Sequence, residues 1–201
     1  MTARVRAATT ACPRCGAALQ STLACLACGA LLDEPADATH FQRLGLPATT
    51  ALDAAAAERN YLRLSRALHP DFHGGADEAA TGRANAATAV LNEAWSVLSE
   101  PASRAEYLLE LLEPGVMERS KQLSPAFLAE AMDLSEEADA AARDPRAAAG
   151  LRARVQAEAD TRLASVLAPG AWVEPDARRL ATTLHELRVL RRVLRDLGKP
   201  A

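Results

Sequence analysis

The chain has 201 residues and a formal net charge of -3 at pH 7, and 49% of its residues are hydrophobic although only 3% are aromatic. This length allows one or two domains with a hydrophobic core, which Leu, Ala and Val must largely fill. The slightly negative charge is unfavourable for a generic nucleic-acid binder, and no stretch approaches the roughly 18 apolar residues of a membrane span. We therefore expect neither nucleic acid nor membrane as a partner.

The N-terminal residues contain a weak targeting signal. Arg4 and Arg6 lack nearby acidic residues, as in the leaders of proteins imported into the mitochondrial matrix. However, the first 11 residues have no apolar secretory core, and the first cysteine follows so soon that little chain remains to be cleaved. We therefore favour the cytoplasm of a bacterium.

All the cysteines lie near the N-terminus, in two CxxCG motifs formed by Cys12, Cys15, Cys25 and Cys28. Each motif can place two thiolates on one side of a tight turn, and the glycine permits the positive φ that such turns need. Four thiolates suit one tetrahedral zinc ion, and iron is also compatible with this ligand set. Disulfides are the alternative, but thiols inside cells usually stay reduced.

A zinc-knuckle module of residues 1–34 is too small to fold on its apolar area alone. We therefore expect the metal to order it. Because four cysteines fill the coordination sphere and leave no position for water, the site should be structural rather than catalytic.

An alanine-rich segment from about Ala54 to Leu68 is typical of a helix. Arg59, Arg63 and Arg66 follow at spacings of four and three, so that they share one solvated face. Pro70 lacks an N–H group and disfavours a helical conformation at the residue before it. The helix should therefore end at His69-Pro70-Asp71, where Gly74-Gly75 keeps the turn loose. Alone, this tripeptide indicates only a turn.

A second helix is expected from about Asp77 to Leu98, antiparallel to the first. The predicted apolar faces are Tyr61, Leu64 and Leu68 on the first helix and Ala87, Val90, Leu91, Ala94, Trp95 and Leu98 on the second. The segment from Asn92 to Leu109 resembles the end of a J domain, and in particular that of the HscB family, the co-chaperones of iron-sulfur cluster assembly. Phe41-Gln-Arg-Leu44-Gly45-Leu46-Pro47 resembles the opening helix and turn of that family. Some HscB relatives also carry an N-terminal tetracysteine module. The resemblance implies a J domain at residues 38–112.

Beyond Pro114-Gly115, three longer helices are expected, with Ser124-Pro125, Asp144-Pro145 and Glu174-Pro175 as their starts and Pro169-Gly170 as a stop. Their apolar stripes predict a C-terminal three-helix bundle over residues 118–198. The predicted fold is all-α: a zinc-knuckle module, a J-domain helical hairpin and this bundle. The stripe residues of the three helices are Phe127, Ala131, Leu134, Ala138 and Ala141, then Leu151, Val155, Ala159 and Leu163, then Leu180, Leu184, Leu187, Leu190, Leu194 and Leu197.

The first helix of this bundle carries five acidic and no basic residues between positions 126 and 140. By composition this is a solvated face. In the HscB family, the corresponding helix binds the cluster scaffold protein, IscU, through an apolar patch ringed by acids. The resemblance assigns scaffold binding to Leu128, Met132, Asp133, Glu136 and Val189. The chain departs from the family at Ala129, Ala140 and Val189, where a larger apolar residue, an acid and an aromatic are common.

The resemblance implies that the J domain binds a DnaK- or HscA-type chaperone and speeds its ATP hydrolysis. His69, Pro70 and Asp71 would act on that partner, while the arginines steer it. The chain itself should not be an enzyme, because no nucleophile or phosphate-binding loop accompanies His69.

Two alternatives come from other classes of protein. One is a zinc-ribbon nucleic-acid binder, suggested by the cysteines and by six arginines against two acids in residues 176–195. The leucine stripe in that segment favours a bundle helix instead. The other is a general J protein with a different client.

Overall fold

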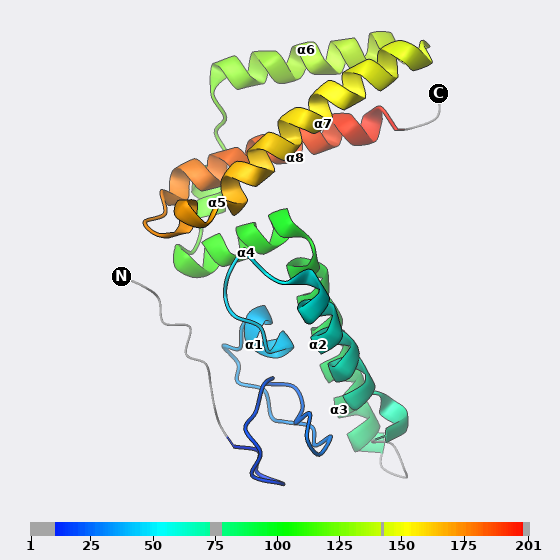
Figure 1. The fold of residues 1–201 in the computed structure, drawn as a ribbon, viewed down its shortest axis with the longest axis vertical. Helices are drawn as coiled ribbons and strands as arrows, with labels where there is room; N and C mark the ends of the chain where they lie inside the picture. Colours follow the sequence, from blue (N-terminus) through cyan, green and yellow to red (C-terminus); the bar gives the residue numbers. More distant parts are fainter. Residues whose placement is uncertain (1–10, 73–77, 142, 199–201) are drawn as a thin grey trace. The chain divides into compact units, whose positions relative to one another are not determined.

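The computed structural model describes residues 11–72, 78–141 and 143–198. In these ranges the regular structure is helical, apart from two isolated bridges, Ala11 with Ala18 and Ala24 with Leu31. The chain divides into two compact units, Met1–Arg104 and Ala105–Ala201 (Figure 1). The all-α prediction is confirmed. Arg4, Arg6, Gly74-Gly75 and Asp77, which carried predictions, lie outside the described residues.

A helical hairpin forms the centre of the first unit. It consists of α2 (Ala54–Ala67) and α3 (Glu78–Ser99), and α1 (His40–Leu44) packs against both helices (Figure 1). The Tyr61 ring stacks on Trp95 with centroids 4.8 Å apart. Of the predicted apolar faces, the hairpin buries Leu64, Leu68, Leu91, Ala94 and Leu98, and the remaining members are half-buried. Ala57 and Ala84 are buried as well, although the prediction omitted them.

Local chemistry accounts for both ends of α2, although only the C-terminal end was predicted. The Asp53 carboxylate accepts a hydrogen bond from the Ala56 N–H at 3.1 Å, which satisfies one of the free donors of the first turn. The helix ends at Ala67, and a 3-10 turn, η1 (Pro70–Phe72), follows. Pro70 therefore marks the end of the helix and the start of an outward turn.

A buried arginine stabilises the C-terminal end of α3. Arg104 lies on α4 (Pro101–Leu112) and donates to the Leu98 carbonyl at 2.6 Å and, through two nitrogens, to the Thr50 carbonyl at 3.1 and 3.0 Å. Its guanidinium thus satisfies a helix-end carbonyl and holds the loop that precedes α2. The pKa of Arg104 is lowered, because burial disfavours its charge.

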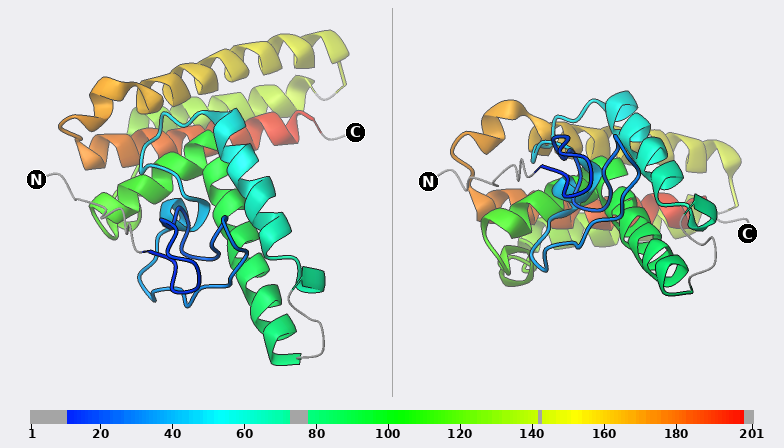
Figure 2. Two further views of the ribbon diagram at one scale, coloured as in Figure 1. Left: turned by 60° about the horizontal axis from the view of Figure 1, so that its bottom comes forward. Right: turned by 90° about the horizontal axis from the view of Figure 1, so that it is seen from below.

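The second unit contains the predicted three-helix bundle. It is formed by α6 (Pro125–Ala141), α7 (Pro145–Leu167) and α8 (Ala177–Asp196), which lie side by side (Figure 2). The starts at Ser124 and Asp144 are confirmed, since both side chains accept helix N–H groups. Two short elements were not predicted: α5 (Val116–Arg119) and a 3-10 turn, η2 (Pro169–Trp172).

The predicted start of the last helix was wrong by two residues. Glu174-Pro175 does not open it; the Asp176 carboxylate caps it instead, accepting from the Arg179 N–H at 3.0 Å. Aspartate in this position satisfies a free donor of the first turn, which Pro175 cannot do.

Leucine packing forms the core of this bundle. Leu184, Leu187 and Leu190 of α8 are almost completely buried, as is Val155 of α7. The arginine-rich α8 is therefore a bundle helix with a charged outer face, as the leucine stripe predicted.

One cation joins the three helices of the bundle. Arg162 of α7 lies over the Phe127 ring of α6, 5.1 Å from its centroid, and donates to Glu186 of α8 at 3.0 Å. It also pairs with Glu158 of its own helix. The partly buried pairs and the ring contact fix the packing of the three helices against one another.

Candidate metal centre and partner-binding surfaces

The two CxxCG motifs fold into matching knuckles. The Gly16 N–H donates to the Cys12 carbonyl at 2.9 Å, and the Gly29 N–H donates to the Cys25 carbonyl at 2.8 Å. The two glycines have φ of 73° and 72°, a conformation that other residues adopt at a cost. The predicted need for glycine after the second cysteine of each pair is confirmed.

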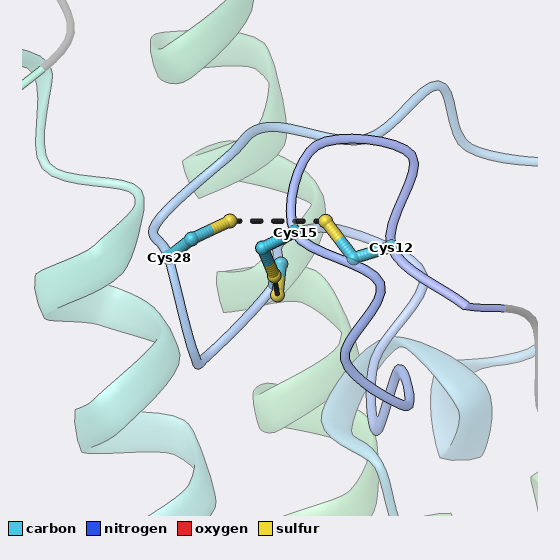
Figure 3. A group of neighbouring side chains, drawn as sticks. Cys12, Cys15 and Cys28 are labelled. Atoms are coloured by element: carbon cyan, nitrogen blue, oxygen red, sulfur yellow. Dashed lines mark hydrogen bonds between the residues drawn. The ribbon is translucent and has the colours of Figure 1, made fainter.

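The knuckles bring the four sulfur atoms together, with all Sγ atoms within 4.8 Å of one another. The Sγ atoms of Cys12 and Cys28 are 3.7 Å apart (Figure 3), and those of Cys15 and Cys25 are 3.8 Å apart. Four sulfurs placed about 2.3 Å from one metal ion would stand about 3.8 Å apart at tetrahedral angles. The cysteines are free thiols, and these separations far exceed the roughly 2.05 Å of a disulfide. The set fits one tetrahedral metal ion.

Proton affinities in the cluster also indicate a cation site. Burial raises the pKa of Cys12, but the Arg14 and Cys15 N–H groups and the neighbouring thiols outweigh it and lower that pKa to about 7. The Ala17 N–H lowers the pKa of Cys15, whereas the Cys28 thiol, burial and the other thiols raise it to about 12. Thiolates this close repel one another, so a bound cation is what allows all four to lose their protons.

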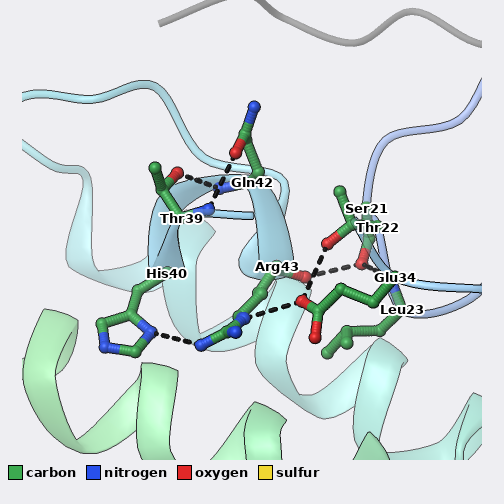
Figure 4. A network of polar contacts seen from close by, with 8 residues as sticks. All are labelled: Ser21, Thr22, Leu23, Glu34, Thr39, His40, Gln42 and Arg43. Atoms are coloured by element: carbon green, nitrogen blue, oxygen red, sulfur yellow. Dashed lines mark hydrogen bonds and ion pairs between the residues drawn. The ribbon is translucent and has the colours of Figure 1, made fainter. Parts of the chain in front are cut away.

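The cysteine module packs directly on α1 (Figure 4). The Ser21 hydroxyl donates to the Arg43 carbonyl at 2.6 Å, and the Arg43 side chain donates to Glu34 at 2.7 Å. Both charged groups are about four-fifths buried, at 17% and 21% exposure. This pair therefore links the end of the cysteine module to α1, the helix that packs on the hairpin.

A close backbone approach reinforces this contact. Gly45 has φ of 65°, and a Cβ atom there would lie 2.5 Å from the Gln20 carbonyl oxygen. Only glycine allows the two chains to approach so closely. The module is thus part of the first compact unit rather than a separate domain joined to it by a linker.

The His69-Pro70-Asp71 tripeptide lies exposed at the end of α2. The Asp71 N–H donates to His69 Nδ1 at 3.3 Å, and the Asp71 carboxylate lies 3.6 Å from the same nitrogen. The side chains of His69 and Asp71 are 55% and 85% exposed. Phe72, the next residue, is 77% exposed and contacts the His69 ring edge to face. An imidazole, a carboxylate and an aromatic ring are therefore presented together.

The three arginines of α2 form the predicted exposed stripe. Arg59 lies 4.0 Å from Asp53, with both side chains about two-thirds exposed. Arg63 and Arg66 are exposed and have no carboxylate partner in the described part of the chain. Exposed charges of this kind contribute little to folding and are available to an acidic partner.

A groove lies between α6 and α8, with a volume of about 530 Å³. Leu128 and Met132 enter it from α6 and Val189 from α8, and the first two are 48% and 65% exposed. Glu136 also lines the groove, but Asp133 does not. Arg192 and Asp196 line it as well. Four of the five predicted scaffold-binding residues thus meet at one groove, which we call the α6–α8 groove.

No protein-family model matches the chain. It is 33% identical, over 162 residues, to the co-chaperone protein HscB homolog of Bordetella parapertussis, a match that covers 79% of this chain and 94% of that protein. The homolog of Burkholderia multivorans is 32% identical over 164 residues, covering 80% of this chain and 92% of that protein. The chain belongs to the HscB family of co-chaperones.

Solved structures of HscB proteins share this fold. HscB from Vibrio cholerae matches with a TM-score of 0.70 and 26% identity, covering 80% of this chain and 96% of that one. Human HscB matches with a TM-score of 0.76 and 22% identity, covering 94% of this chain and 97% of that one. At this identity the human match shows similarity of fold alone. It covers more of this chain than the Vibrio cholerae match does.

The positions at which this HscB-family chain departs from the expected pattern have different surroundings. Ala129 and Ala140 are exposed on α6 and lie outside the lining of the α6–α8 groove, whereas Val189 lies in it. Of the acids on α6, Glu137 pairs with Arg154 of α7. The pKa of Glu130 is raised by partial burial and by Glu158. These two acids therefore lie toward α7 and outside the lining of the α6–α8 groove, although both are exposed.

Sequence reasoning missed Arg192 and Asp196 in the groove. Their signal was their spacing, three and seven residues after Val189, which places them on the same face of α8. None of the described helices has the combined length and apolarity required to cross a membrane.

Proposed function

We propose that this HscB-family protein stimulates the ATPase of a DnaK- or HscA-type chaperone and brings an IscU-type iron-sulfur cluster scaffold protein to it. The observation that carries the proposal is that one chain has both His69-Pro70-Asp71 exposed beside a basic helix and a separate apolar groove with charged residues. In this proposal residues 38–112 act as the J domain and residues 118–198 as the scaffold-binding bundle, with residues 1–34 as the metal module.

The chaperone would be bound through α2 and the tripeptide. Asp71 is an exposed acceptor for an arginine of the partner, and a charge-assisted pair of this kind is stronger than a neutral hydrogen bond. Arg59, Arg63 and Arg66 would steer an acidic surface of the chaperone toward it. Pro70 holds the turn in which His69 and Asp71 point outward. The protein hydrolyses no ATP itself; it acts on the catalytic centre of its partner.

The scaffold would be bound in the α6–α8 groove. Leu128 and Met132 are exposed apolar side chains, the kind of anchor that contributes most to an interface once buried. Val189 extends the apolar floor from α8, and Glu136 with Arg192 provides charges of both signs at the edge. Asp133, exposed on α6, would contact the scaffold outside the groove itself.

The metal would be zinc, with iron as the alternative, because four thiolates in a closed tetrahedral site suit either ion. Cys12, Cys15, Cys25 and Cys28 would hold it. When bound, the ion supplies charge neutralisation and a cross-link between the two knuckles. We place the protein in the bacterial cytoplasm, where thiols stay reduced.

Single-turnover ATP hydrolysis by the cognate chaperone tests the proposal. We expect the intact protein to accelerate hydrolysis, the scaffold to amplify the effect, and His69→Gln to abolish it. Absence of stimulation by the intact protein would contradict the J-domain mechanism. Stimulation that is indifferent to the scaffold would leave a J protein with another client.

A further inference from the structure

A second cleft lies within the first unit, between the cysteine module and the helical hairpin. It has a volume of about 610 Å³. One side is the second knuckle, from Cys28 to Leu31; the other is formed by the end of α2, by Phe72 of η1 and by the start of α3. Figure 2 shows the module beside the hairpin. We call it the knuckle cleft.

Three arginines from three different segments line this cleft. They are Arg14 of the first knuckle, Arg66 of α2 and Arg83 of α3, and all are exposed. Among the described residues, the lining includes no acid and no carboxylate pairs with these arginines. Like charges gathered without a counter-charge repel one another, so the cleft favours an acidic ligand.

The cleft adjoins the tripeptide. Phe72 lines it and directly follows Asp71, and its ring lies 6.2 Å from the His69 ring, centroid to centroid. Arg66 belongs both to the exposed stripe of α2 and to the cleft. A partner docked on His69-Pro70-Asp71 would therefore lie beside the knuckle cleft, which makes that partner the simplest occupant of the cleft.

The first cysteine knuckle fixes the position of Arg14. Arg14 stands between Cys12 and Cys15, and its N–H donates to Cys12 Sγ at 3.4 Å. The backbone of Arg14 is thus hydrogen-bonded to one of the four cysteine sulfurs, while its side chain lines the cleft. Ordering of the knuckle presents this charge at a defined position.

We propose that the tetracysteine module completes a chaperone-binding surface: the knuckle cleft, with Arg14, Arg66 and Arg83, receives an acidic segment of the chaperone ATPase. The inference rests on the proposed chaperone activation. It gives the metal module a direct part in binding, in addition to its own ordering.

The test titrates this protein against the chaperone in the single-turnover assay and extracts the half-stimulating concentration and the maximal rate. We expect Arg14→Glu and Arg83→Glu each to raise the half-stimulating concentration about ten-fold, with the maximal rate kept. Arg14→Lys keeps the charge and should stay near the intact protein. Arg178→Glu, at an exposed arginine in the first turn of α8, is the matched control. Metal content and helical circular dichroism confirm that each variant is folded.

The outcomes separate this inference from the function on which it rests. If Arg14→Glu and Arg83→Glu titrate like Arg178→Glu while His69→Gln abolishes stimulation, the cleft has no part in chaperone binding although the J-domain mechanism holds. If the intact protein gives no stimulation, both proposals fail. Salt adds a further readout, because the gap between the intact protein and Arg14→Glu should narrow as ionic strength rises.

Discussion

The cysteine module and the helical bundle reach an ordered structure by different means. In the module the buried apolar side chains are small, apart from Leu23, and its contacts with α1 include the Ser21 hydrogen bond and the Arg43–Glu34 ion pair. The bundle buries five leucines of α8: Leu180, Leu184, Leu187, Leu190 and Leu194. Burial of apolar area can order the bundle, whereas we propose that the module relies on a metal ion to hold its knuckles. Damage to one region should therefore leave the other intact.

The largest effect is expected for Cys25→Ser. Loss of one thiolate opens the tetrahedral site, and structural zinc contributes on the order of 10 kcal/mol to the ordering of small modules. Metal content should fall from one ion per chain to nearly none, and a protease should then cleave within residues 11–34. Helical circular dichroism should change little. Loss of the bundle helices in this variant would contradict the separation of the two regions.

The converse change is Leu187→Ala in the bundle. Leu187 is 1% exposed, and a cavity at such a position costs about 2 to 5 kcal/mol. Denaturant unfolding should show this loss, while the metal content stays at one ion per chain. Leu62→Ala, at a residue 48% exposed on α2, is the control and should cost far less.

Arg104→Met examines the polar contacts that hold the hairpin. The change removes the buried donor and leaves the carbonyls of Thr50 and Leu98 without their hydrogen bonds, at a cost of about 2 to 4 kcal/mol. Thermal unfolding should show the loss. Equal stability of the variant would mean that water replaces these bonds at little cost.

The smallest change in folding is expected for Met132→Ala. This side chain is 65% exposed, so the free energy of unfolding should hardly change. Affinity for the scaffold should fall by about 1 to 3 kcal/mol if Met132 is buried in the complex, as calorimetric titration would show. Leu112→Ala, 40% exposed on α4, is the matched control. Similar losses in both variants would argue against the α6–α8 groove as the binding site.

Local features of this protein were readable from the sequence. The cysteine spacing predicted the knuckles, and the spacing of Leu64, Leu91 and Leu98 predicted the faces on which the hairpin packs. Caps at Ser124 and Asp144 were also correct, because a cap depends on residues two or three positions away. The last cap was misplaced because Pro175 and Asp176 are adjacent and both are favourable near the start of a helix. The backbone conformation shows that Asp176 is the cap.

Features that join distant residues were decided by tertiary structure. Arg104 was visible only as part of a family motif, and its bonds to Thr50 depend on how the loop before α2 packs. Arg14, Arg66 and Arg83 are up to 69 positions apart in sequence and meet only because the cysteine module folds against the hairpin. Spacing puts Arg192 on the same face of α8 as Val189, but only the packing of α6 beside α8 makes that face one side of a groove.

The sequence by itself determined the helical fold class, the four-cysteine candidate metal site and the turn at the tripeptide, because helix periodicity, turn chemistry and ligand spacing are properties of short segments. Only the tertiary structure decided which charges share a cleft and which apolar side chains stay exposed. Those outcomes depend on the packing of whole elements, whose contacts no short segment specifies.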